Sequence, residues 1–170
     1  QYLMKDLNVG ISRMQINSIL FALAFVFIML VVTLKSIKIA LSSLVPIIIT
    51  IVAVYGFLGI SGIPLNITTT MIFSITIGVG IDYAVHFSSV YKVYLSEYSK
   101  LEAVKKAFKY TSRPVIANAL GISIGLSMLM FSPLKIHFNV ATLMWVSMIV
   151  SVLMTLTLLP VILTRGKIND

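Results

Sequence analysis

Asp82 is an acidic residue within a long apolar stretch of the chain. Placing an aspartate at the centre of a membrane helix costs about 2.5–3.5 kcal/mol on insertion scales, so such a residue needs a function or a partner. Apolar surroundings disfavour the charged form of a carboxyl group, whereas water restores it. A carboxyl that changes protonation with hydration can carry a proton across an apolar layer, and we expect this of Asp82. The alternative is a buried acid held by hydrogen bonds or by a cation.

Small and polar residues recur at every fourth position on both sides of this acid. In a helix, such residues lie about 6 Å apart along the axis, on one slowly winding side. We call this side the polar ridge and define it by Asn66, Thr70, Ser74, Gly78, Asp82 and His86. A ridge of this kind faces protein or water instead of lipid tails.

Tyr83 and His86 are the side chains best placed to work with Asp82. His86 lies one helical turn from the acid, and an imidazole titrates near neutral pH, so it could pass the same proton on. A histidine at the membrane interface with no such function is an equally good interpretation. Tyr83 points about 100° away from Asp82 and could hydrogen-bond a neighbouring helix, in the proton path or as plain packing.

Other residues would support this site. Ser74 belongs to the ridge, while Gly78 and Gly80 leave room for another helix to approach beside the acid. Asn118, in a later apolar segment, is expected to face the bundle. There its side chain could form a hydrogen bond with the backbone of a neighbouring helix. A hydrogen bond with Asp82 is the less favoured interpretation. The same segment carries a row of small residues suited to close helix packing, at Ala117, Gly121 and Gly125.

No second kind of chemistry has a comparable pattern. The sequence has no cysteine, no glycine-rich phosphate loop, no cluster of metal ligands and no pair of nucleophile and base. We therefore expect neither an enzyme, nor a metal site, nor an organic cofactor.

The composition of the 170 residues indicates what must position this acid. The chain is 59% hydrophobic and only 11% charged, with a mean hydropathy of +1.06. Soluble domains have about 25% charged and about 45–50% apolar residues. The composition therefore excludes a soluble globular domain and predicts a membrane protein.

Five stretches are long and apolar enough to cross a bilayer as helices, which takes about 20 residues each. They are residues 16–34, 39–60, 67–87, 114–131 and 139–163. The predicted fold is an all-α membrane protein, a bundle of five transmembrane helices over 16–163. Residues 1–15 form an extracytoplasmic segment in this prediction, and 164–170 form a cytoplasmic tail.

The basic residues predict the orientation of these spans. Ten of the thirteen fall on one side: Lys35, Lys38, Lys92, Lys100, Lys105, Lys106, Lys109, Arg113, Arg165 and Lys167. The positive-inside bias makes this side cytoplasmic, in a multi-pass protein of the plasma (inner) membrane. The formal net charge of +8 then reflects topology and attraction to lipid headgroups, so nucleic acid is not an expected partner.

The longest predicted loop, residues 88–113, lies on this cytoplasmic side. Apolar and aromatic residues recur in it at steps of three and four, and Ser99 with Glu102 matches a capping box, which starts a helix. We expect an amphipathic helix lying on the inner leaflet, with an ordinary solvated connecting helix as an equal alternative.

Four separated segments resemble the resistance-nodulation-division (RND) superfamily. Residues 78–87, Gly-Val-Gly-Ile-Asp-Tyr-Ala-Val-His-Phe, are similar to its GxGxDYxxHF signature. Residues 11–16, 61–66 and 111–114 also stand where the superfamily would place them. The hydrophobe/amphiphile and MMPL-type lipid exporters are the branch most similar, and their membrane fold is shared by sterol-sensing domains.

This resemblance implies one half of a twelve-helix transporter, the second half if the short tail is natural. It implies export of lipids or other hydrophobic molecules, driven by the proton motive force. Asp82 and Tyr83 match the superfamily's proton-relay pair, and His86 matches a position that is often histidine. The implied partners are the bilayer, the hydrophobic substrate, the other half-bundle and the extracytoplasmic domains. The sequence leaves open whether the protein also forms a homo-oligomer.

Two other functions share this architecture. A sterol- or lipid-sensing module would bind lipid without transport, and this binding would survive loss of Asp82. A SecD/SecF-like accessory subunit for protein export typically has Asp-Ala-Asn where this chain has Asp82, Tyr83 and Ala84, which counts against it.

Overall fold

The computed structural model describes residues 2–63 and 67–165, with the side chains of these residues except 2–15, 67, 68, 73, 76 and 77. This described part is helical, without strands, which confirms the predicted all-α membrane fold. The long helices are α1 (Tyr2–Leu34), α2 (Ile37–Ser61), α3 (Ile67–Leu95), α4 (Lys100–Ser127) and α5 (Lys135–Leu153). A 3-10 turn (Met128–Phe131) follows α4, and a π-helical turn (Met154–Leu158) joins α5 to α6 (Leu159–Arg165).

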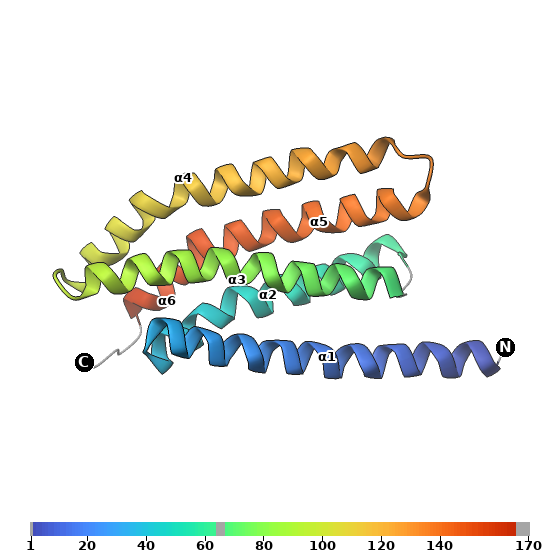
Figure 1. Cartoon of the computed structure of the whole chain (residues 1–170), viewed down its shortest axis with the longest axis horizontal. Helices are drawn as coiled ribbons and strands as arrows, with labels where there is room; N and C mark the ends of the chain where they lie inside the picture. Colours follow the sequence, from blue (N-terminus) through green and yellow to red (C-terminus); the bar gives the residue numbers. More distant parts are fainter. Residues whose placement is uncertain (1, 64–66, 166–170) are drawn as a thin grey trace.

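The helices run lengthwise beside one another, and their connections gather at two ends (Figure 1). One end holds the α1–α2 turn, the α3–α4 turn and the end of α6, and the opposite end holds the start of α1 and the α4–α5 connection. The sequence assigned the first three of these to the same side of the membrane from their basic residues. The bundle does place them together, so we call this end the basic end.

Four segments in the described residues are long and apolar enough to cross a membrane: Ile16–Leu34, Ile37–Ser61, Lys100–Phe131 and Lys135–Arg165. They correspond to the first, second, fourth and fifth predicted spans. The third predicted span lies in α3, which is 29 residues long and runs along the bundle with the others (Figure 1). The count of five spans stays a prediction.

The segment 88–113 differs from its prediction as a loop with a separate surface helix. Only residues 96–99 lie outside helices, because α3 continues to Leu95 and α4 starts at Lys100 and runs unbroken through Pro114. Ser99 is the N-cap as expected, with its carbonyl accepting the Ala103 N–H at 2.8 Å, although its side chain makes no capping bond. One row of buried residues continues along the whole of α4: Ala103, Val104, Ala107, Thr111, Val115, Ala119 and Ser123. Because this row is packed along its whole length, the segment runs parallel to the other helices of the bundle and does not lie across its end.

Most of the first fifteen residues, predicted as an extracytoplasmic segment, belong to helix α1. Helix α1 begins at Tyr2 and continues without a break into the first predicted span. Its N-terminal part extends beyond the ends of the other helices (Figure 1).

Helix α2 ends at a turn after Ser61. Gly62 ends α2 in the left-handed conformation, at φ 65°, which glycine adopts without steric cost. Residues 64–66, among them Asn66 of the ridge, lie outside the described residues.

Two polar contacts tie α3 to its neighbours near the basic end. The Ser43 and Ser88 hydroxyls share a buried hydrogen bond of 2.5 Å between α2 and α3. The Lys92 ammonium donates to the carbonyl of Leu34, one of the unpaired carbonyls at the end of α1. A cation at a helix C-terminus is also favoured by the helix dipole. These contacts fix the rotation of α3, and with it the direction in which Asp82 points.

Candidate functional site

Helix α3 has one packed side and one uncovered side. Its packed side is formed by large residues with at most 1% of their surface exposed, among them Tyr83, Phe87 and Tyr91. On the opposite side, Ser74, Gly78, Asp82 and His86 are all exposed. These four are members of the predicted polar ridge, and a fifth, Thr70, is half-buried. The other helices of this chain therefore leave the described ridge uncovered around its acid.

Asp82 makes no hydrogen bond or ion pair with another described residue. The alternative of an acid fixed by a cation therefore has no partner within the described part of this chain. His86 is exposed on the same side, one turn nearer the basic end. In this part of the chain, no three His, Asp or Glu residues gather into a set that could hold a metal ion.

Tyr83 lies on the packed side of α3, away from the ridge. Its side chain is 1% exposed, and its hydroxyl donates to the sulfur of Met148 on α5, at 3.7 Å. The structure thus places Asp82 and His86 on the same side of α3 but turns Tyr83 towards α5. A thioether is a weak acceptor, so this contact orients the tyrosine more than it stabilises the fold.

The two glycines near the acid have different surroundings. A Cβ atom on Gly80 would lie 3.4 Å from the Ser151 hydroxyl oxygen of α5 and 3.9 Å from Ile47 of α2. The absence of a side chain on Gly80 therefore lets α3 approach these two helices closely. A Cβ atom on Gly78 would meet nothing within 4 Å, because Gly78 lies on the uncovered ridge.

Asn118 is exposed on α4, and no hydrogen bond joins it to Asp82. The small residues Ala117, Gly121 and Gly125 of the same helix are exposed too, and Cβ atoms on the two glycines would meet nothing within 4 Å. In the described part of this chain, no helix packs against this row. Both α3 and α4 therefore carry an uncovered side with small and polar residues.

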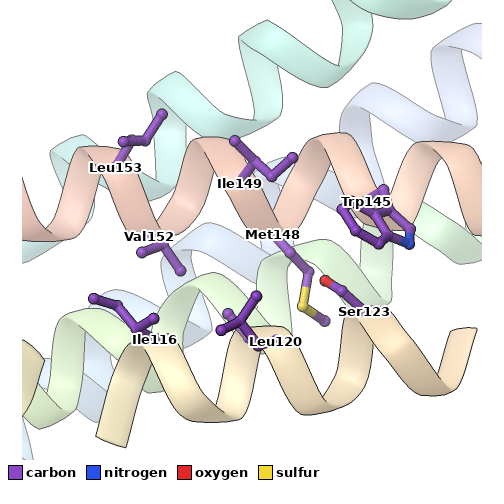
Figure 2. Close-up of a pocket in the computed structure, with 9 residues that line it drawn as sticks. Ile116, Leu120, Ser123, Trp145, Met148, Ile149, Val152 and Leu153 are labelled. Atoms are coloured by element: carbon purple, nitrogen blue, oxygen red, sulfur yellow. The ribbon is translucent and has the colours of Figure 1, made fainter. Parts of the chain in front are cut away.

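An apolar crevice opens between α4 and α5, with a volume of about 180 Å³. Figure 2 shows the side chains that point into it from the two helices. The lining residues are Ile116, Ala119, Leu120 and Ser123 of α4, and Trp145, Met148, Ile149, Val152 and Leu153 of α5. Met148 is 1% exposed and forms the floor, while the Trp145 indole N–H donates to the Ser127 hydroxyl at 3.1 Å. The floor of the crevice is thus the residue that contacts Tyr83.

Sequence reasoning missed the role of Met148. A methionine among apolar neighbours carries no sign that its sulfur will accept a hydrogen bond across two helices. Only the packing of α3 against α5 reveals this link between the crevice and the residue next to Asp82.

Comparison with known proteins gives two findings. The family model described as the MMPL family matches residues 1–166. A membrane protein of Methanocaldococcus jannaschii is 25% identical to the chain over 139 residues, which cover 81% of the chain and 36% of that relative. The chain therefore spans little more than a third of the length of the curated relative that it matches.

Proposed function

Because this chain belongs to the MMPL family, within the RND superfamily, we propose that it is the membrane half of a proton-driven exporter of lipids or other hydrophobic molecules. Asp82 is the proton-carrying acid in this proposal. In this proposal the protein lies in the plasma membrane with its basic end on the cytoplasmic side, which the distribution of basic residues favours.

The uncovered ridge is the observation that carries this proposal. An isolated acid exposed to lipid tails would be costly, so the side of α3 with Asp82 needs a protein partner or water. The other half-bundle of a larger transporter would supply this cover, with the uncovered side of α3 at the contact. Water entering such a seam would reach Asp82 without crossing the packed core.

The geometry suits a proton carrier that alternates between two sides. Asp82 would take up a proton when water reaches the ridge from the outer side, and its neutral form would tolerate a dry seam. When the seam opens at the basic end, the proton would leave past His86, which lies one turn nearer that end. Tyr83 would not belong to this path directly, because it points to Met148.

The crevice supports a hydrophobic cargo. Its walls belong to two helices apolar enough to lie in a bilayer, and only Ser123 and Trp145 among its lining residues have polar side-chain atoms. A hydrocarbon chain in the crevice would contact Met148, and through it Tyr83. This contact offers a direct mechanical route between cargo and the helix that carries the acid.

Filling the crevice tests this part of the proposal. Leu120→Trp is expected to lower export by the full-length protein about tenfold, equivalent to about 1.4 kcal/mol, because the indole would occupy the space of the cargo. Export is measured at matched membrane abundance. Ile124→Trp is the control, since Ile124 is 63% exposed on the same helix and does not line the crevice. Equal export by both variants would remove the crevice from the cargo path.

The crevice also keeps a second function open, that of a lipid-sensing module without transport. Binding of a hydrophobic ligand in the crevice would be common to both functions. They differ in Asp82, which only the exporter needs, so substitution of this acid separates them.

A further inference from the structure

The α3–α4 turn at the basic end is held together by aromatic rings. The Lys106 ammonium lies over the rings of Tyr98 and Tyr94, at 4.1 and 5.4 Å from their centroids. The Tyr94 ring stacks on that of Tyr110, with centroids 5.7 Å apart. Burial, followed by the hydrogen bond to Tyr110, raises the pKa of the Tyr94 hydroxyl, so it stays neutral at physiological pH and adds no negative charge here. The Lys106 ammonium is therefore engaged in contacts within the protein.

Three other basic residues of α4 make no such contact with aromatic rings. Lys105, Lys109 and Arg113 are all exposed, and none makes an ion pair or a ring contact in the described part of the chain. Their spacing of four residues places them on one side of the helix, about 6 Å apart along its axis. We call these three residues the basic stripe. Neither Glu97 nor Glu102, the acids nearest in sequence, pairs with them.

The basic stripe directly precedes the fourth predicted membrane span, residues 114–131. Arg113 precedes Pro114, where the fourth predicted span begins, and the helix is unbroken there. The headgroup layer on each side of the hydrocarbon core is about 5–8 Å thick. Steps of about 6 Å along α4 therefore put Arg113 at the inner edge of this layer and Lys109 within it. Lys105 lies about 12 Å from Arg113, just beyond the layer, and its long side chain can reach back to the phosphates.

From this charge and depth we propose that the basic stripe binds the phosphate groups of anionic phospholipids in the surrounding leaflet. Long basic side chains can reach sideways to lipids while their stems lie along the helix. The start of α4, which carries the stripe, is held to α3 by the contacts of Lys106 and Tyr110, so little order has to be gained on binding. This inference does not depend on the proposed export function.

The test measures lipid selectivity of the full-length protein in nanodiscs of phosphatidylcholine and phosphatidylglycerol. The protein is extracted gently, and the retained phosphatidylglycerol is counted by native mass spectrometry. The triple variant K105Q/K109Q/R113Q is expected to lose the enrichment of phosphatidylglycerol by at least about threefold, since each cation near the surface contributes to attraction of anionic lipid. The charge-conserving variant K105R/K109R/R113K is expected to keep it.

Two controls make the outcome decisive. Lys135→Gln removes an exposed cation at the opposite end of the bundle and is expected to leave the enrichment unchanged. Unchanged melting temperatures show that the surface substitutions do not unfold the protein. Equal enrichment in the triple glutamine variant and the native protein overturns the proposal. A second result would also overturn it. If soluble inorganic triphosphate displaces phosphatidylglycerol from the native protein, at a concentration at which K105R/K109R/R113K keeps its phosphatidylglycerol, the stripe is a site for a free polyanion.

Discussion

Export by the full-length protein is expected to fall to the level seen with a proton ionophore when Asp82 is replaced by asparagine. Asparagine keeps the size and polarity of the side chain but cannot exchange the proton. Loss of a group that transfers a proton typically lowers a rate by about 10²–10⁴-fold, and we expect a loss of at least about a hundredfold here. Export is compared at matched membrane abundance, with and without the ionophore.

Neighbouring substitutions on the same exposed side distinguish protonation from simple polarity. Asp82→Glu, which keeps a titratable group, is expected to retain part of the export, and Ser74→Ala nearly all of it. His86→Gln is expected to have an intermediate effect if the proton leaves past the imidazole. Undiminished export by Asp82→Asn would make the acid structural and would favour the lipid-sensing function.

Replacing Gly80 by isoleucine is expected to destabilise the bundle by about 1–3 kcal/mol, the usual range for overpacking. The side chain would have to enter the contact among α3, α5 and α2, where Ser151 and Ile47 leave space for a Cβ atom but not for its branches. The measurement is the melting temperature of the purified full-length protein in detergent.

Gly78→Ile is the matched comparison, since it puts the same side chain on the same helix where nothing lies within 4 Å. We expect it to leave the fold of this half intact and to interfere with export instead, by obstructing the side that the other half would cover. Gly80→Ala is expected to be tolerated, because 3.4 Å is an ordinary contact distance. Equal melting temperatures for the two isoleucine variants would contradict the close approach at Gly80.

The sequence predicted most of the architecture because apolar stretches and basic residues report directly on a bilayer. Four of the predicted spans coincide with helices apolar enough to cross it, and the connections rich in basic residues do lie at one end. The four-residue period also placed Ser74, Gly78, Asp82 and His86 on one side of α3, because a helix has a fixed pitch.

Helix boundaries and cross-helix contacts were harder to predict. Polar composition suggested that residues 88–113 leave the helices, whereas tertiary packing along Ala103, Ala107 and Thr111 keeps them helical. The sequence alone does not distinguish Gly78 from Gly80. The rotation of α3 about its axis decides which of the two faces a neighbouring helix. The contact of Tyr83 with Met148 depends on the same rotation.

The four-residue turn between α3 and α4 bears on how the protein enters the membrane. Insertion of α3 alone is penalised by Asp82 at its centre, whereas α4 belongs to a segment apolar enough to insert. A connection limited to residues 96–99 brings the two helices together soon after synthesis and makes their pairing local in sequence. The two would then enter the bilayer as one helical hairpin, in which the apolar α4 compensates for the acid that α3 must carry.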